Sequence, residues 1–500
     1  PSAFFNYSLT TQDLERVSLS GESGLSLDGM LLFNSFTRNT QGQFVRGFTN
    51  LTLDNRERLR RWVIGDSFAG ASGLGGSLLL GGVSLSRNFG LDPYFVRYPT
   101  LTYSGAALSA TTVEIYINDT LVRREQLPPG PFELRNLPVV AGRGSARIVL
   151  RDAFGRLEDV VLPGYFSSRV LAKGLSEYSY HLGLRRENTG TRSWDYGPLA
   201  FLGQHRFGVT DSLTAGFRLE ATRDLVNGGP AIQARLPFGE IEVAAAASHA
   251  KGTSGAAASL AYTYLGRPAS LSASLRLLSP RYAHLNLEPE RDRARFQANA
   301  SASFHLHPRA GLTLQYAFSH LRDRGRNHRP SFLANLRVTR RATLLLSGSH
   351  MRDTGRPSVL ELFGGVSYYL GKNTTANVSH RDVDGRGTTT FEVQKSLPVG
   401  EGFGYRVQAQ RGTQERLSGL FHYSAPFGRY EAQFDRSAGR TSTTLRLSGG
   451  SVSIGGRMYF TRPVQDAFAL IRVPGVARVQ GYFSNQKIGR TDARGDLLIP

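Results

Sequence analysis

The sequence has 500 residues, contains no cysteine, and carries 60 Lys and Arg against 39 Asp and Glu, a formal charge of +21. The missing cysteines exclude disulfide scaffolds, thiolate zinc sites and cysteine nucleophiles, while 29 Phe and 20 Tyr exclude a disordered chain. No apolar run approaches the roughly 18–20 residues that a membrane-spanning helix needs. A membrane protein built from alternating strands stays open, because alternation hides its hydrophobicity from any average.

The positive charge comes almost entirely from arginine, since only five lysines occur: Lys173, Lys251, Lys372, Lys395 and Lys487. A nucleic-acid-binding protein usually gathers its basic residues into one patch or stripe. Here the arginines are spread along the whole chain, commonly beside Asp, Glu or Gly. We therefore expect no nucleic-acid partner and assign the charge to polar strand faces and loops.

Residues 1–103 are predicted to form the first part of a large β-barrel. A membrane-crossing strand takes about 9–11 residues, so that a strand with its share of a turn occupies about 16. At that spacing, this first segment holds about 6 strands.

Residues 104–171 depart from the flanking pattern and predict a small inserted β-sandwich. Short apolar segments such as 113–117 and 147–150 are separated by turn-forming sequence at 128–132 and 152–155. Compact strands joined by proline and glycine corners are typical of a sandwich domain. Barrel-like sequence flanks the segment on both sides, so we interpret it as an insertion.

Residues 172–463 return to strict alternation, which predicts about 18 further strands. In 213–221 and 403–409 the odd positions are apolar and the even positions are mostly polar or small. Successive strand side chains point to opposite faces, so each strand has one apolar and one polar face. The polar side chains that we assign to the lumen are Arg218, Glu220, Arg406, Gln408, Glu431 and Asp435.

A soluble sandwich would give the same alternation, so the composition of the two strand faces must distinguish a soluble sandwich from a membrane barrel. The polar faces carry Thr, Ser, Gln, Gly and scattered Arg, whereas the apolar faces carry Phe, Tyr, Leu and Ala. That division suits a polar lumen and a lipid-facing exterior. The fold class is therefore predicted as all-β: a transmembrane barrel of about 24 antiparallel strands, wide enough to need an obstruction.

Residues 464–500 change character again and predict the start of another small β-domain, with a hairpin turn near 489–495. The sequence opens without Met or a charged and apolar leader and stops abruptly after Leu-Leu-Ile-Pro. We therefore expect it to be part of a longer protein.

Several blocks in the sequence resemble the outer-membrane ushers of the chaperone–usher pathway, which assembles pili on Gram-negative bacteria. The segment 61–67 resembles the Trp-x-x-Gly-Asp block of an early usher barrel strand. Segment 127–132, with Pro128, Pro129, Gly130, Pro131 and Phe132, is the most specific match to the usher plug domain. Other matching blocks are 81–86, 97–101, 113–118, 136–137, 466–470, 473–476 and 489–495.

The resemblance implies a 24-stranded barrel with a plug between strands six and seven, which agrees with the count above. It also implies a channel rather than an enzyme, with no cofactor. Its partners would be outer-membrane lipid, pilus subunits and the periplasmic chaperone–subunit complexes that deliver them. Subunits would polymerise by donor-strand exchange, in which a strand of one subunit completes its neighbour. The usher's N-terminal periplasmic domain would precede Pro1, and most of its C-terminal domains would follow Pro500.

Candidate sites are few. Hinges of the inserted domain are expected among Pro99, Gly105, Gly164 and Gly174, although glycine and proline are ordinary at strand ends. The pair His305 and His307 lacks a third metal ligand nearby, and Asp384-Gly385 is predicted as a hairpin turn rather than a calcium loop. No nucleophile elbow, phosphate-binding loop or zinc-protease motif occurs in the sequence.

Two rival functions remain beside an usher pore. A passive porin could carry the insertion as a mere constriction, and an outer-membrane hydrolase is disfavoured by the missing motifs. The residues leave open the oligomeric state, the pilus and the chaperone.

Overall fold

The computed structural model describes residues 1–70, 73–92, 103–107, 111–117, 120–127, 130–134, 146–151, 157–162, 170–210, 212–236, 238–265, 268–288, 294–371, 373–413, 415–483 and 486–500. Of the side chains between 103 and 162, it describes those of Val113 and Glu114. Within these ranges, no helix is long and apolar enough to cross a membrane. The helix η1 (Phe89–Leu91) has a single turn.

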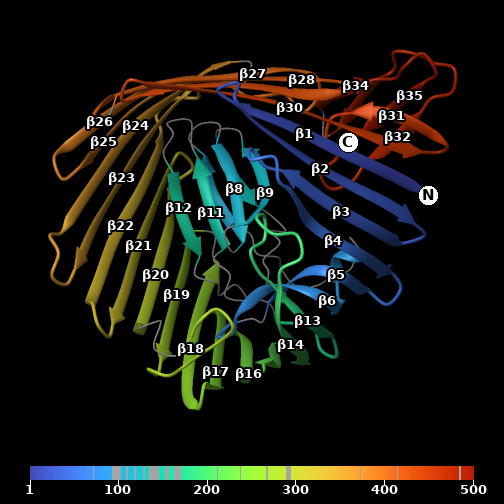
Figure 1. Ribbon diagram of the computed structural model, residues 1–500. Helices are drawn as coiled ribbons and strands as arrows, with labels where there is room; N and C mark the ends of the chain where they lie inside the picture. Colours follow the sequence, from blue (N-terminus) through green and yellow to red (C-terminus); the bar gives the residue numbers. More distant parts are fainter. Residues whose placement is uncertain are drawn as a thin grey trace.

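Two groups of antiparallel strands build one closed barrel (Figure 1). The first group is β1 (Ser2–Gln12), β2 (Arg16–Leu27), β3 (Met30–Arg38), β4 (Phe44–Asn55), β5 (Arg60–Gly70) and β6 (Ser77–Arg87). The second group is β13 (Ser176–Arg186), β14 (Tyr196–Thr210), β15 (Leu213–Thr222), β16 (Leu225–Leu236), β17 (Gly239–Ala250), β18 (Thr253–Leu265), β19 (Ala269–Leu278), β20 (Ala294–His307), β21 (Ala310–Leu321), β22 (Gly325–Arg337), β23 (Ala342–Asp353), β24 (Val359–Gly371), β25 (Thr374–Val383), β26 (Arg386–Lys395), β27 (Gly402–Gly412), β28 (Arg416–Ala425), β29 (Gly428–Ser437) and β30 (Arg440–Ile454).

Two pairings between strands distant in sequence close the barrel. Strand β6 pairs with β13 from Ser86↔Ser179 to Leu80↔Arg185, and β1 pairs with β30 along its whole length. The barrel therefore has 24 strands, and the predicted strand count is confirmed. The short strand β31 (Arg457–Thr461) pairs with the end of β30 beyond β29.

The connections between strands alternate between the two ends of the barrel, because neighbouring strands are antiparallel. The end where β1 begins and β30 ends is here called the terminal rim, and the other end the opposite rim. The longest connections between consecutive barrel strands, β13–β14 and β19–β20, both lie at the opposite rim.

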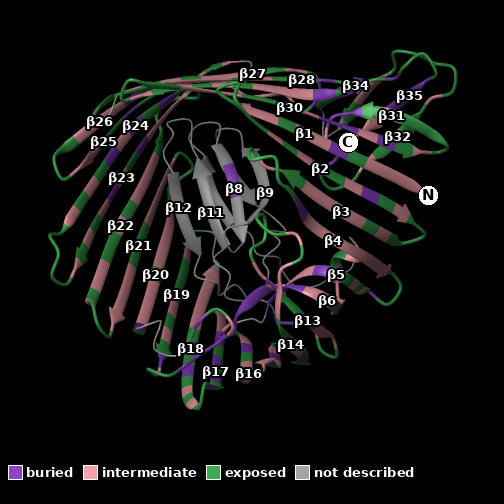
Figure 2. Cartoon of the chain, viewed as in Figure 1, coloured by how far each residue is buried: buried purple, intermediate pink, exposed green. Residues whose placement is uncertain are grey.

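Large apolar side chains alternate outward along the strands and remain exposed. Phe217 is 59% exposed and Val407 52%, whereas their neighbours Arg218 and Gln408 face the interior. Figure 2 shows most barrel strands alternating between intermediate and exposed residues, while buried residues gather around β5 and β6. A water-soluble protein buries such apolar faces, so this exterior suits a lipid bilayer.

Six short strands separate β6 from β13 in the sequence: β7 (Tyr103–Ala107), β8 (Thr111–Ile117), β9 (Thr120–Leu127), β10 (Gly130–Leu134), β11 (Ala146–Arg151) and β12 (Leu157–Leu162). They form a four-stranded sheet in the order β12-β11-β8-β9 and a two-stranded sheet of β10 and β7. In the view of Figure 1, the four-stranded sheet lies within the outline of the barrel.

Four strands follow the barrel: β32 (Ala469–Arg472), β33 (Gln480–Phe483), β34 (Gln486–Arg490) and β35 (Asp496–Ile499). Strand β32 pairs with β35, and β33 pairs with β34. The Asn6 side-chain amide donates to the Val464 carbonyl at 2.7 Å and its oxygen accepts from the Val464 N–H at 2.9 Å. Asn6 therefore holds the chain that leaves the barrel against β1, as a paired strand would.

Asp496 links the C-terminal strands to β31 and is expected to make their attachment sensitive to acid. Hydrogen bonds from Tyr459 and Arg472, and a further one from Arg457, hold the pKa of the Asp496 carboxyl below its usual 3.8. A lowered carboxyl pKa contributes stability above the unfolded value that is lost as pH falls through the folded one. We expect the protection of the β32 and β35 amides from hydrogen exchange, relative to their intrinsic rates, to fall below about pH 4, and Asp496→Asn to remove that pH dependence.

Candidate functional site

The lumen-facing polar residues predicted from sequence divide into two groups. Arg406 and Gln408 on β27, with Glu431 and Asp435 on β29, lie half-buried on the interior face. Glu431 lies 3.5 Å from Arg446, and Asp435 accepts from Arg416 at 2.6 Å. Glu431 and Asp435 therefore line the wall in ion pairs with arginines of neighbouring strands.

Arg218 and Glu220 differ, because both are fully enclosed. Glu220 is 0% exposed, and its carboxylate accepts from the backbone N–H groups of Gly76 at 2.7 Å and Leu285 at 3.1 Å. Gly76 ends the β5–β6 connection, and Leu285 belongs to the β19–β20 connection. One strand residue thus holds together two connections that are distant in sequence.

The β19–β20 connection makes further hydrogen bonds to the interior face. Asn286 accepts from the Ser77 N–H and donates to the Ser77 carbonyl, both at 2.6 Å. Asn227 on β16 donates to the Ala283 carbonyl at 2.8 Å, and Ser248 on β17 accepts from the Ala283 N–H at 2.9 Å. Residues 282–286 therefore lie folded inward against β15–β17 and are bonded to the β5–β6 hairpin.

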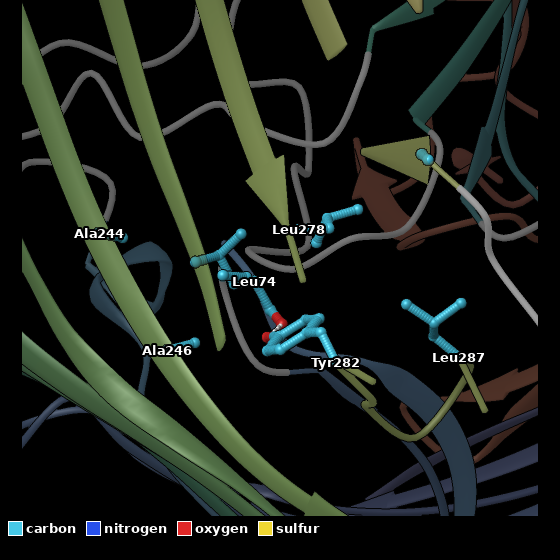
Figure 3. Close-up of a cluster of buried hydrophobic side chains, with 8 residues drawn as sticks. Leu74, Ala244, Ala246, Leu278, Tyr282 and Leu287 are labelled. Carbon is cyan, nitrogen blue, oxygen red and sulfur yellow. Dashed lines mark hydrogen bonds between the residues drawn. The ribbon is translucent and has the colours of Figure 1, made fainter. Parts of the chain in front are cut away.

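An apolar cluster completes this contact (Figure 3). Tyr282 packs with Leu74, Ala246 and Leu278, and its hydroxyl donates to the Leu74 carbonyl. Burial raises the pKa of the Tyr282 hydroxyl above its ordinary value. The assembly formed by Leu74, Gly76, Glu220, Tyr282 and Asn286 is here called the lumen clasp.

The lumen clasp should open locally when Glu220, which accepts its backbone hydrogen bonds, is changed. In Glu220→Gln, an NH2 group replaces one of two oxygens that face backbone N–H donors, and leaving a buried donor without its acceptor costs about 1–3 kcal/mol. We expect faster hydrogen exchange at Gly76 and Leu285, measured by mass spectrometry. Ser418→Ala, on the interior face of β28, is the control and should leave both amides unchanged.

Three glycines in one register allow the β5–β6 hairpin to approach its neighbours. Gly65, Gly82 and Gly183 are paired across β5, β6 and β13. A Cβ at Gly65, whose φ is +111°, would lie 2.4 Å from the Thr49 carbonyl oxygen, and one at Gly82 would lie 2.1 Å from the Leu182 oxygen. Only glycine fits where backbones come this close.

A buried ionic cluster begins where β4 and β5 stop pairing, at Asn50↔Gly65. Asp66 is 1% exposed and accepts from Arg46 at 2.5 Å, and Arg186 lies 2.7 Å away. Its carboxylate also accepts from the Tyr196 hydroxyl at 2.8 Å and the Thr49 N–H at 2.9 Å.

These contacts to Asp66 replace the missing strand pairing with side-chain bonds. Arg46 also lies 4.1 Å from the Trp194 ring, which belongs to the β13–β14 connection. The cluster thereby fastens β4 and β5 to the β13–β14 hairpin.

The candidate residues of the insertion are only partly within the described chain. Pro99, Pro128, Pro129 and Gly164 lie outside the described residues. Gly130, Pro131 and Phe132 are the first three residues of β10, and Phe132 is paired with Gly105 of β7. Gly105 therefore lies inside a sheet rather than in a linker.

Of the two candidate hinges within the described residues, Gly174 lies in a turn. Its φ is +81°, and its N–H donates to the Gly208 carbonyl at 2.9 Å. No atom lies within 4 Å of a Cβ built there, so the left-handed backbone alone favours glycine.

The other motifs have ordinary structural roles. Asp384 and Gly385 form the two-residue turn between β25 and β26, both with positive φ, as predicted. A register shift separates His305 from His307. Among the described residues, no group of three or more His, Asp or Glu is placed to hold a metal ion.

Sequence reasoning missed the lumen clasp and the cluster around Asp66. Periodicity placed Arg218 and Glu220 on the inner face of a strand, but it cannot predict that the β19–β20 connection folds inward against them. The available signal was the loss of alternation after Leu278, where Pro280 and Pro289 interrupt an otherwise regular strand pattern.

Residues 60–284 and 281–500 match the family described as outer membrane usher protein. The chain belongs to the outer membrane usher family. It is 26% identical over 277 residues to the outer membrane usher protein FimC of Bordetella pertussis (strain Tohama I), covering 54% of this chain and 31% of that protein. The aligned segment thus spans about a third of the length of this usher, and the family places its barrel in the outer membrane.

Solved structures of an usher have the same fold. The translocation pore of the P pilus usher PapC superposes with a TM-score of 0.62 at 16% identity, over 90% of this chain and 99% of that one. PapC in an Escherichia coli P pilus tip assembly intermediate with PapD, PapK and PapG superposes with a TM-score of 0.71 at 17% identity. That match covers 100% of this chain and 66% of PapC.

Proposed function

We propose that this chain is the pore of an usher, through which pilus subunits are assembled and secreted, and that β7–β12 close the pore at rest. One observation carries the proposal. The six inserted strands leave the barrel after β6 and return at β13, although β6 and β13 pair directly in the wall. An insertion made in this way can move without opening the barrel.

The connections support a direction for the pore. In outer-membrane barrels, short turns face the periplasm and long connections face the exterior. The β13–β14 and β19–β20 connections are the longest between consecutive strands and lie at the opposite rim. The terminal rim, from which both the insertion and the C-terminal strands emerge, then faces the periplasm, where subunits would arrive.

The proposed partners are periplasmic chaperone–subunit complexes. Membership of the usher family supports them, as does the similarity to PapC, whose assembly intermediate contains PapD, PapK and PapG. Polymerisation by donor-strand exchange draws on the folding free energy of the completed subunit. The chain then acts as an assembly channel without a catalytic centre of its own.

Planar-bilayer recording tests the closure. The intact chain is expected to give little steady conductance, whereas a variant in which a glycine–serine linker replaces residues 104–171 should give a large one. The linker has little to span, because β6 and β13 are neighbours. Equal and large conductance in both proteins would reject closure and favour a porin with an inserted constriction.

A cellular experiment separates the usher from that porin. The same deletion in the chromosomal gene should abolish surface pili, counted by electron microscopy, while increasing uptake of large antibiotics. The matched control Asp54→Ala alters a partly exposed ion pair and should leave both unchanged. A chromosomal deletion that increases uptake but leaves pili at their normal number would contradict assembly through this barrel.

A further inference from the structure

Four basic or imidazole side chains share one face of β21, β22 and β23 near the opposite rim. His320 is paired directly with Arg326, and His328 is paired with Arg352. Paired residues of neighbouring strands point to the same face, as do residues two apart on one strand. His320, Arg326, His328 and Arg352 therefore form one contiguous group, here called the basic patch.

The basic patch lies on the outer face of the barrel. Tyr316, Phe332 and Leu346 lie an even number of positions from patch residues on the same strands, and hence on the same face. They are 42%, 41% and 43% exposed. The Tyr316 hydroxyl lies 2.8 Å from His328 Nδ1, and the Phe318 ring lies 4.8 Å from the His328 ring.

The order of apolar, aromatic and basic side chains along these strands matches the order of layers in a bilayer, from the hydrocarbon to the headgroups. From the terminal rim toward the opposite rim, the outer face of β22 presents Leu336, Phe332, His328 and then Arg326. Outer-membrane barrels carry an apolar band bordered by aromatic residues at the level of the lipid headgroups. The basic patch thus lies just beyond that border, where headgroup phosphates lie.

The two arginines of the patch have free guanidinium groups. Both are exposed, and within the described chain neither guanidinium makes a hydrogen bond or an ion pair. Asp353 points to the opposite face, where it accepts from Asn327, and Asp323 lies 3.8 Å from Arg324 in the turn. The patch therefore has excess positive charge on a surface that contacts lipid.

We propose that the basic patch binds the phosphate groups of a phosphorylated glycolipid in the outer leaflet of the outer membrane. Guanidinium groups bind phosphate through two parallel hydrogen bonds. Arginines on neighbouring strands can contact separate phosphates of one headgroup, while Tyr316 and Phe318 pack beside the sugar and upper acyl chains. The strands fix the backbone positions of both arginines, so binding requires ordering of their side chains but not of a loop.

Native mass spectrometry of the intact chain in detergent, titrated with bis-phosphoryl lipid A, tests the site. Near a membrane surface each arginine contributes about fivefold to binding of anionic lipid, so R326Q/R352Q should bind roughly 25-fold more weakly. The matched control is R411Q/R436Q. Those arginines also face outward near the opposite rim, but β28 separates their strands.

Two further measurements test whether the weaker binding of R326Q/R352Q comes from the lost contacts between its arginines and the phosphates of lipid A. R326K/R352K keeps the charges but loses the paired guanidinium hydrogen bonds, so its affinity for lipid A should lie between those of the unchanged chain and R326Q/R352Q. The migration of each variant on gels without heating reports whether its barrel has folded. Removal of both phosphates from lipid A should reduce binding to the level of R326Q/R352Q. Equal losses in R326Q/R352Q and R411Q/R436Q, or equal binding of phosphatidylglycerol and lipid A, would overturn the proposal.

Discussion

Asp66→Ala is expected to destabilise the folded barrel by about 3–5 kcal/mol, the cost of leaving buried charges without their partner. The substitution removes the carboxylate that forms ion pairs with both Arg46 and Arg186, whose guanidinium groups are buried. It also frees the Thr49 N–H, which joins β4 to β5 where their backbones no longer pair. The measurement is a urea titration of the barrel in lipid vesicles, followed by gel mobility.

The control for Asp66 is Asp54→Ala, which acts on the same pair of strands. Asp54 accepts from Arg61 at 2.7 Å, but both side chains are partly exposed. Such pairs contribute about 0–1 kcal/mol. A similar loss of stability in both variants would mean that the Asp66 cluster does not hold β4 and β5 together.

Phe217→Arg is expected to reduce the free energy of folding into lipid by about 2–4 kcal/mol, the penalty for arginine on the lipid face near the bilayer midplane. Phe217 lies at the middle of β15 and is 59% exposed on the outer face. The guanidinium there would have to be desolvated by hydrocarbon or drawn toward the headgroups. Folding yield in vesicles at increasing urea measures the effect.

The control for Phe217→Arg must be a substitution at a lumen residue that does not belong to a network of hydrogen bonds. Arg218, its neighbour, is unsuitable because it donates to the Tyr282 hydroxyl at 3.3 Å inside the barrel. Arg406→Gln, on the interior face of β27, is expected to change stability by less than about 0.5 kcal/mol, and Phe217→Leu controls for size. If Arg406→Gln costs as much as Phe217→Arg, the outer face has been assigned to the wrong side.

Much of the barrel could be predicted from the sequence, because the alternation of polar and apolar residues within each strand indicates which face contacts water. Phe217 and Arg218 adopt opposite faces for the same reason that any two successive strand residues do. Dividing chain length by the span of one membrane strand was then enough to predict about 24 strands. The closing pairs of the barrel follow from the absence of free edges in lipid.

The residues with dense contacts could not be predicted in the same way. Glu220 has the parity of any lumen residue, and its burial depends on residues 282–286, which are 62 or more positions away. Asp66 lies in a strand pattern like its neighbours, yet it accepts from Arg46 and Tyr196 and forms an ion pair with Arg186. Periodicity reports local geometry, whereas these sites arise from long-range contacts.

The pairing of β1 with β30 has a consequence for how the barrel forms. Residues 2–12 find their second partner only among residues 444–454, which are the last barrel strand to be made. Until then, two strand edges with unpaired backbone groups remain open, and such edges invite pairing with other chains. Because contacts so distant in sequence form slowly, completion of this barrel depends on its final strand, and a nascent chain must be kept apart from its neighbours until that strand arrives.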